Sequence, residues 1–171
     1  MNKILYILSM FLISNLTFGQ KLKKNEIDEF TKSHIQTTSW ETLSKKHPLF
    51  SYARLRKIDS VYIFDVKLMG GNKVFSVDKG ENLYIKLDDD EIIKIYNTEY
   101  ELSNYGEGAV GILGSQSLGV YLKCSIRKEQ LKKLREKKII KIRLYSSNGY
   151  READVKSKHA KKFIKMMNLI K

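Results

Sequence analysis

Alternation of apolar and polar side chains is the clearest pattern in the chain, and it is most regular from Val61 to Met69. A period of two residues is typical of a β-strand that buries one face. Together with β-branched and aromatic content and short polar turns, this pattern predicts a series of strands. They span 37–43, 52–58, 61–69, 74–77, 83–87, 92–96, 99–103, 121–126, 139–145 and 150–155.

Apolar residues spaced three and four positions apart predict two helices in the C-terminal part of the chain. Leu131 and Leu134 lie on one side of a short helix at 128–137. Ser157 is placed to cap a last helix, which extends to the C-terminus. The apolar side of that helix comprises Ala160, Phe163, Ile164, Met167 and Ile170.

Most connections between the strands are too short to hold the helix that a parallel crossover requires. We therefore expect an α+β fold: a mostly antiparallel β-sheet or sandwich, with the short helix near 128–137 and the C-terminal helix packed on the sheet. The chain has 171 residues, of which 42% are hydrophobic and 30% charged. This composition fits one globular domain and excludes a disordered, collagen-like or disulfide-stapled chain.

Residues 1–19 show the three-part pattern of a secretory signal peptide. Lys3 supplies a positive start, Ile4 to Phe18 is uncharged and mostly apolar, and Thr17 and Gly19 are the residues at the expected cut. A membrane-spanning helix needs about 20 apolar residues, which is more than this run provides. An uncleaved anchoring helix is the alternative interpretation.

These features divide the chain into a signal peptide at 1–19, a polar tether at 20–29 and a single β-rich domain at 30–171. We expect the protein to be exported to the periplasm or the cell exterior after cleavage near Gly19. We expect no transmembrane span in the mature chain, because it contains no apolar run of sufficient length.

Residues 104–119 form a long glycine-rich segment without a regular pattern. Gly106, Gly108 and Gly111 match the spacing of a dinucleotide-binding loop, but the helix and the acidic residue that such a site requires do not follow. No nucleotide is therefore expected. Two interpretations stay open, a loop that packs over the core or a contact loop for a partner. In the second case the apolar residues Val110, Ile112 and Leu113 are the candidate contacts.

Cys124 is the single cysteine, and it alternates with Val120 and Leu122 on one face of a predicted strand. This position favours a small buried side chain over a nucleophile. The four carboxylates of Asp88-Asp89-Asp90-Glu91 lie in a predicted hairpin turn. This cluster indicates a solvated hairpin tip and not a calcium site, because the spacing of a calcium-binding loop is absent.

The remaining candidates for chemistry are scattered. Metal ligands on a helix usually lie three or four residues apart. His34, His47 and His159 each lack a partner at that spacing. Trp40 is interpreted as a packing residue of the core or a sheet edge, with a sugar-binding platform as the alternative. We therefore assign no catalytic, cofactor-binding or metal-ligating residue, and we expect no cofactor.

Positive charge is concentrated in the C-terminal third. The formal net charge of the chain is +13, and residues 123–171 hold 17 Lys and Arg but only four Asp and Glu. Such a surface can contact anionic lipid, acidic polysaccharide or nucleic acid, although nucleic acid is not expected for an exported chain. A plain solvated surface is the alternative. The candidate contacts are Lys158, Lys161, Lys162 and Lys165 on the polar side of the last helix.

Three stretches of the sequence resemble a family of small exported bacterial proteins of uncharacterised function. They are Asp28-Glu29-Phe30-Thr31 followed by Thr38-Ser39-Trp40-Glu41, then Asp65-Val66-Lys67-Leu68-Met69, and finally Ile142-Arg143-Leu144-Tyr145-Ser146-Ser147-Asn148-Gly149-Tyr150. The resemblance implies export and a compact β-rich domain. It assigns no activity and no site residue.

The sequence thus favours a non-enzymatic exported domain that binds or structurally supports an unidentified envelope or extracellular partner. A hydrolase with an unrecognised active site is one alternative, for which Cys124 or scattered carboxylates would have to serve. A binder of anionic surfaces through the basic C-terminal helix is the other. A pocket with perturbed carboxylates or a Cys–His contact would favour the hydrolase.

The mature N-terminus tests the predicted signal peptide. We expect exported protein to begin at or near Gln20, because small residues end the apolar run just before it. Intact-mass analysis of protein from the exported fraction of the native host, compared with the whole-cell lysate, gives this position. Exported protein that retains Met1 would contradict the prediction.

Overall fold

The computed structural model describes residues 22–111 and 116–171. The predicted signal peptide and the candidate contacts Ile112 and Leu113 lie outside the described residues. The expected fold class is confirmed, because antiparallel strands dominate and are accompanied by a short helix and a C-terminal helix. None of the described helices is long and apolar enough to cross a membrane.

The helices are α2 (Lys128–Glu136) and α3 (Ser157–Met167). The strands are β1 (Leu22–Ile27), β2 (His34–Thr38), β3 (Glu41–Lys46), β4 (Leu49–Ile58), β5 (Val61–Met69), β6 (Ser76–Val77), β7 (Gly80–Leu87), β8 (Ile92–Asn97), β9 (Glu101–Leu102), β10 (Asn104–Tyr105), β11 (Leu118–Ser125), β12 (Ile139–Ser146) and β13 (Gly149–Asp154).

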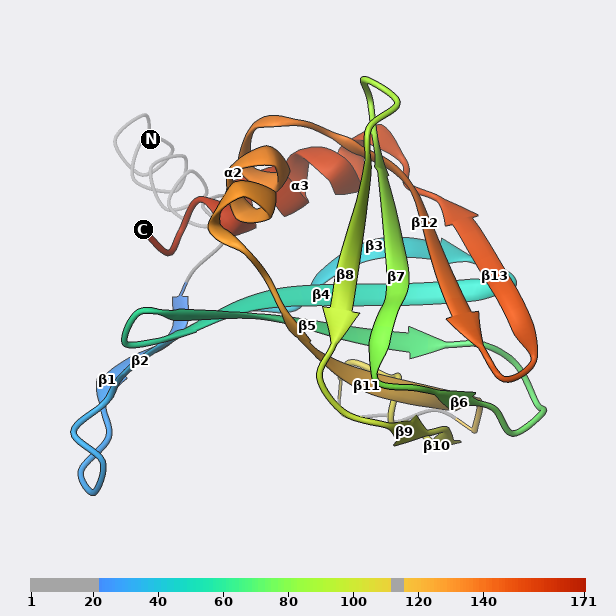
Figure 1. Ribbon diagram of the computed structural model, residues 1–171, viewed down its shortest axis with the longest axis horizontal. Coiled ribbons are helices and arrows are strands. Elements are labelled where there is room, and N and C mark those ends of the chain that lie inside the picture. Colours follow the sequence, from blue (N-terminus) through green and yellow to red (C-terminus); the bar gives the residue numbers. More distant parts are fainter. Residues whose placement is uncertain (1–21, 112–115) are drawn as a thin grey trace, which may run out of the picture.

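Eleven strands of the described chain form one antiparallel sheet in the order β1-β2-β4-β5-β11-β8-β7-β12-β13, with β3 beside β4 and β10 beside β11. The sheet bends at β11, where only Cys124 and Ser125 pair with Asn97 and Tyr96 of β8. As a result, β4, β5 and β11 run across β7, β8 and β12 (Figure 1). We call β3, β4, β5 and β11 the first half of the sheet, and β7, β8, β12 and β13 the second half.

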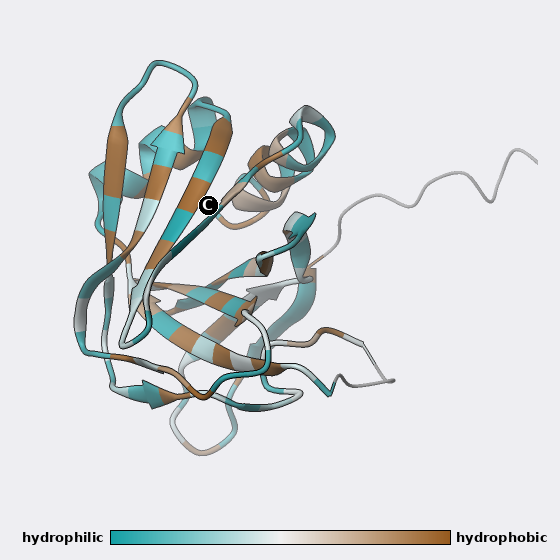
Figure 2. Ribbon diagram, turned by 90° about the vertical axis from the view of Figure 1, so that its right-hand side faces the viewer, coloured by the Kyte–Doolittle hydropathy of each residue, from teal (hydrophilic) through white to brown (hydrophobic). Residues whose placement is uncertain are grey.

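The core lies between the two halves, which diverge like the arms of a V (Figure 2). Hydrophobic and hydrophilic residues alternate along the strands, so that each half buries one face. Helix α3 contacts β3 and β4 of the first half and β12 of the second. Its Phe163 is fully buried and meets Phe64 of β5 edge to face, with 5.9 Å between the ring centroids. Helix α3 therefore closes the open side of the folded sheet.

The apolar side of α3 differs slightly from the prediction. Met166 is buried together with Ala160, Phe163, Met167 and Ile170, whereas Ile164 is only half-buried. The predicted cap was also wrong, because Ser157 is the first helical residue and Lys156 is the N-cap, without a side-chain hydrogen bond. The helix ends at Met167, before the C-terminus.

The predicted tether at 20–29 was wrong, because Leu22–Ile27 forms β1 and pairs with β2. The Asp28 carboxylate fixes the turn of this hairpin by accepting hydrogen bonds from the N–H groups of Phe30 and Thr31. The hairpin extends away from the rest of the molecule (Figure 1), and most of β1 is exposed. A strand that buries neither face shows no alternation, which explains why the pattern missed it.

The predicted strand at 37–43 is divided in two. Thr37 of β2 lies opposite Arg56, and Glu41 of β3 lies opposite Ala53, so the chain between them bulges away from β4. At the break the Thr38 hydroxyl accepts a hydrogen bond from the N–H of Leu55 and donates one to its carbonyl. The side chain thereby replaces the missing backbone partner, which satisfies two buried polar groups of β4.

Truncation of Phe163 tests the role of α3. We expect Phe163→Ala to lower the free energy of unfolding by about 3–5 kcal/mol, because the ring is fully buried between helix and sheet. Denaturant unfolding measures the loss. Lys161→Ala on the exposed side of the same helix is the matched control and should change it by less than about 0.5 kcal/mol. Equal losses in the two variants would contradict the assigned packing.

Candidate functional site

A groove of about 690 Å³ lies where β3 meets the start of α3. We call it the basic groove. Strand β3 supplies one wall, and the end of β13 with the start of α3 supplies the other. It is lined by Leu43, Ser44, Lys45, Lys46, Asp154, Lys156, Lys158 and His159.

The local fold explains why lysines line this groove. Among the described strands β3 pairs with β4 alone, and α3 contacts β3 directly. A register shift between Thr42 and Ser44 leaves Leu43 and Ser44 buried and both Lys45 and Lys46 exposed. Across the groove, the chain leaves β13 and begins α3 within three residues. Basic side chains from distant parts of the sequence therefore converge.

The groove has a strong excess of positive charge. Within residues 22–111 and 116–171, none of Lys45, Lys46, Lys156 and Lys158 forms an ion pair. The carboxylate in the lining, Asp154, lies 3.7 Å from Lys141, which is outside the groove. The lysines thus repel one another, and a concave surface with an excess of one sign of charge concentrates the field.

The positive charge of the groove affects the pKa of His159. Its pKa is lowered below the usual 6.5 first because burial desolvates the ring, and then because Lys158, Lys45, Lys162 and Lys156 oppose a further positive charge. The first turn of α3 also contains no acidic side chain. An anion is the ligand that would relieve the repulsion among these groups.

The structure separates the four lysines predicted as partner contacts. Lys158 lines the basic groove, whereas Lys161, Lys162 and Lys165 are exposed on α3 outside the lining. Sequence reasoning missed the lysines of β3 and Lys156. The adjacent pair Lys45-Lys46 was the only available signal, and the sequence could not show that it lies beside residue 158.

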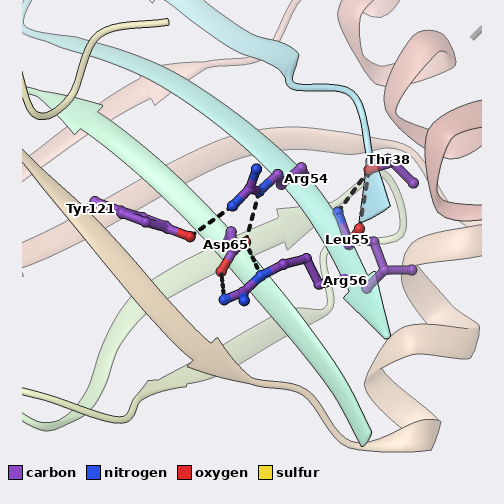
Figure 3. Close-up of polar contacts among 6 residues, drawn as sticks. All are labelled: Thr38, Arg54, Leu55, Arg56, Asp65 and Tyr121. Carbon is purple, nitrogen blue, oxygen red and sulfur yellow. Dashed lines mark hydrogen bonds and ion pairs between the residues drawn. The ribbon is translucent and has the colours of Figure 1, made fainter. Parts of the chain in front are cut away.

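A second polar cluster lies on the outer face of the first half of the sheet (Figure 3). The fully buried Asp65 carboxylate accepts hydrogen bonds from Nε of Arg54 at 2.8 Å, and from Nε and Nη2 of Arg56. Arg54 also donates to the Tyr121 hydroxyl at 2.9 Å. The bond to Asp65 raises the pKa of Arg56. Both carboxylate oxygens are engaged, so the cluster links β4, β5 and β11.

Trp40 belongs to this cluster and lies at the corner between β2 and β3, where it is half-buried. Its ring meets Tyr121 edge to face with 5.8 Å between centroids, and the Arg54 guanidinium lies 4.5 Å from the Trp40 centroid. Lys67 lies 5.5 Å from the same centroid and donates to the Ala109 carbonyl at 2.9 Å. Trp40 is thus a packing residue of the outer sheet surface, held between cations.

The described part of the segment 104–119 is packed down on the sheet. A Cβ on Gly108 would lie 2.3 Å from the Leu68 carbonyl oxygen, and one on Gly119 would lie 2.6 Å from the backbone N of Gly108. Only glycine permits this approach of one backbone to another. Val110 is 38% exposed. The described residues of this segment pack on the sheet, and contact with a partner stays a prediction.

Two other candidates for chemistry are placed as follows. Cys124 is fully buried, as the alternation indicated, and burial raises the pKa of its thiol. Asp88, Asp89 and Asp90 are exposed, as predicted for a solvated tip. The tip is also linked to α2 and the residue after it, because Asp89 pairs with Lys137, and Glu91 with Lys133 and Lys137. No group of three His, Cys, Asp or Glu side chains that could hold a metal ion occurs in the described residues.

Comparison with known proteins adds no relative. No family model matches the chain, and neither a curated protein nor a solved structure is detectably similar to it. A functional assignment therefore rests on the geometry and charge of the basic groove and on the N-terminal pattern.

Asp65→Asn tests whether the second cluster is a structural clamp. We expect a loss of about 3 kcal/mol in the free energy of unfolding, because two arginines would lose the carboxylate that pairs with them. The control is Asp90→Asn, which removes an exposed carboxylate paired with Lys86 and should leave stability unchanged within error. Urea unfolding of both variants decides the question, and an Asp65→Asn variant as stable as the control would refute the clamp.

Proposed function

We propose that this protein is an exported, non-enzymatic binding module that captures anionic ligands in the basic groove. The observation that carries the proposal is the convergence of four lysines, which form no ion pair within residues 22–111 and 116–171, together with His159 around one cavity. Export to the periplasm or the cell exterior is supported by the signal-peptide pattern of residues 1–19 and by the resemblance to small exported proteins.

The size of the groove suits a small ligand or one charged group of a larger one. Binding pockets for small molecules typically measure about 300–1,000 Å³, and the basic groove measures about 690 Å³. Hydrogen bonds from ammonium groups to an anion are stronger than bonds between neutral groups. Binding of this kind weakens as salt screens the charges.

The groove is a better candidate than the open face of the C-terminal helix. Lys161 and Lys165 are exposed to water, where single charges interact weakly. Lys158 is exposed as well, but it shares a concave site with lysines of β3. The hydrolase alternative is less well supported, because Cys124 is buried with a raised pKa and the Asp65 carboxylate is bound by two arginines.

Charge-neutralising variants test the proposed binding function. The groove variant carries Lys45→Gln, Lys46→Gln, Lys156→Gln and Lys158→Gln. The matched control carries Lys128→Gln, Lys132→Gln, Lys161→Gln and Lys165→Gln, which removes the same charge outside the groove lining. With heparin as the polyanion, we expect at least about a tenfold loss of affinity for the groove variant, because four contacts of up to about 1 kcal/mol each disappear.

Titration calorimetry at low and high salt measures both affinities. The control variant should bind within about threefold of the wild type, and wild-type binding should fall as salt increases. Equal losses in the two variants would show that net charge alone attracts the polyanion, and wild-type protein that ignores heparin at low salt would refute the proposal.

A further inference from the structure

We propose that the basic groove receives a phosphate-monoester group and that His159 couples its capture to protonation, so that affinity rises as the pH falls. The inference rests on the proposed function and specifies its ligand and its regulation. It is argued from the arrangement of charges around the cavity.

The lining favours a compact group with more than one charge. Lysine ammonium groups are point charges with three donors each. Lys45 and Lys46 contribute from β3, and Lys156 and Lys158 contribute from the opposite wall. A phosphate monoester carries about 1.5 to 2 negative charges and three acceptor oxygens, so one group can satisfy donors from both walls. A carboxylate or a phosphate diester offers a single charge and would leave more of the repulsion in place.

The surroundings of His159 are predominantly cationic. Lys156 and Lys158 lie on its own side of the groove, and Lys45 and Lys46 of β3 lie across it. Lys162, on α3 outside the lining, adds to the positive field at the ring. Asp154 of β13 also lines the groove and lies near Lys141 of β12.

Of the cations on other elements that contact α3, Lys141 of β12 lies beside Asp154, and Arg54 and Arg56 of β4 pair with Asp65. Two more lie at the far end of the helix. Arg135 of α2 donates to the carbonyls of Met167 and Ile170, and Lys57 of β4 donates to that of Lys171. The positive field at His159 therefore comes from Lys45, Lys156 and Lys158 of the groove together with Lys162 beside it.

The surrounding positive charge determines whether protonation of His159 strengthens or weakens anion binding. In the free protein the pKa of His159 lies below 6.5, because burial and the neighbouring lysines disfavour the imidazolium form. A bound dianion opposes the lysine charges and raises that pKa. Since linkage is reciprocal, protonation of His159 must strengthen anion binding. The gain develops as the pH falls from the pKa of the complex to the lower pKa of the free protein, and it is complete below the latter.

The pH dependence is tested with sulfate, whose charge stays constant over the range and cannot itself cause a pH effect. We expect the wild type to bind sulfate about fivefold more tightly at about pH 5.5 than at about pH 7.5. His159→Gln should bind with little pH dependence. Lys161→Gln, on the exposed face of the same helix, should keep the wild-type profile. Titration calorimetry measures all three, and an unchanged pH profile in His159→Gln would overturn the coupling.

The ligand class is tested at about pH 7.5 with three probes, namely glycerol 3-phosphate, phosphatidic acid vesicles and phosphatidylglycerol vesicles. A phosphate monoester occurs in the first two, and only a diester occurs in the third. If the protein binds glycerol 3-phosphate and prefers phosphatidic acid to phosphatidylglycerol vesicles, the ligand is a soluble phosphate monoester. If it prefers phosphatidic acid vesicles but does not bind glycerol 3-phosphate, the ligand is a lipid headgroup. Equal binding to the two kinds of vesicle, without binding of glycerol 3-phosphate, would overturn the ligand class.

These outcomes are distinct from failure of the proposed function. Sulfate binding that disappears in the four-lysine groove variant but does not depend on pH would refute the role of His159 and leave anion binding intact. Wild-type protein that binds none of heparin, sulfate and the phosphate probes would refute both proposals.

Discussion

Docking of α3 on the open side of the folded sheet is the contact on which both the core and the basic groove depend. Within the described residues the two halves of the sheet share backbone pairing only along a short seam between β11 and β8, and β13 also contacts β3 and β4. Helix α3 packs against both halves and covers the core between them. Phe163 fills this space against Phe64. The same contact places the start of α3 beside β3, and thereby brings residues 156–159 next to Lys45 and Lys46.

The basic groove gathers lysines that form no ion pair within the described residues, whereas several other cations of the molecule are paired. Lys133 and Lys137 are paired with the carboxylates of the β7–β8 hairpin, and Arg54 and Arg56 share Asp65. Mutual repulsion of lysines without ion pairs costs free energy in the free protein, and an anion would remove that cost. Packing of the apolar side of α3 thus holds like charges together, and this preorganisation favours binding of a ligand of opposite charge.

The sequence predicted the elements that bury one face and missed those that do not. Val61 to Met69 alternates because β5 lies in the middle of the sheet, and that strand is where the pattern placed it. Strand β1 was not predicted because most of it is exposed to solvent and therefore shows no alternation. The break at Thr38 depends on a side-chain hydrogen bond to Leu55 that no local pattern encodes.

The basic groove was only partly predictable for a related reason. Lys158 was recognised from the charge of the last helix, but its neighbours on β3 are more than a hundred residues away in the sequence. Their proximity depends on the contact between β3 and α3, which is a tertiary feature. Export and the identity of the partner stay predictions from the N-terminal pattern and the charge.

The location of a bound anion tests the central claim most directly. Two-dimensional ¹H–¹⁵N NMR of the isotope-labelled protein, titrated with sulfate, reports which backbone amides change environment. The account predicts that saturable shifts concentrate at Lys45, Lys46 and residues 156–159, on the two walls of the groove. Shifts that spread over the exposed lysines of α3 and α2, without saturation and without a maximum at the groove, would contradict it.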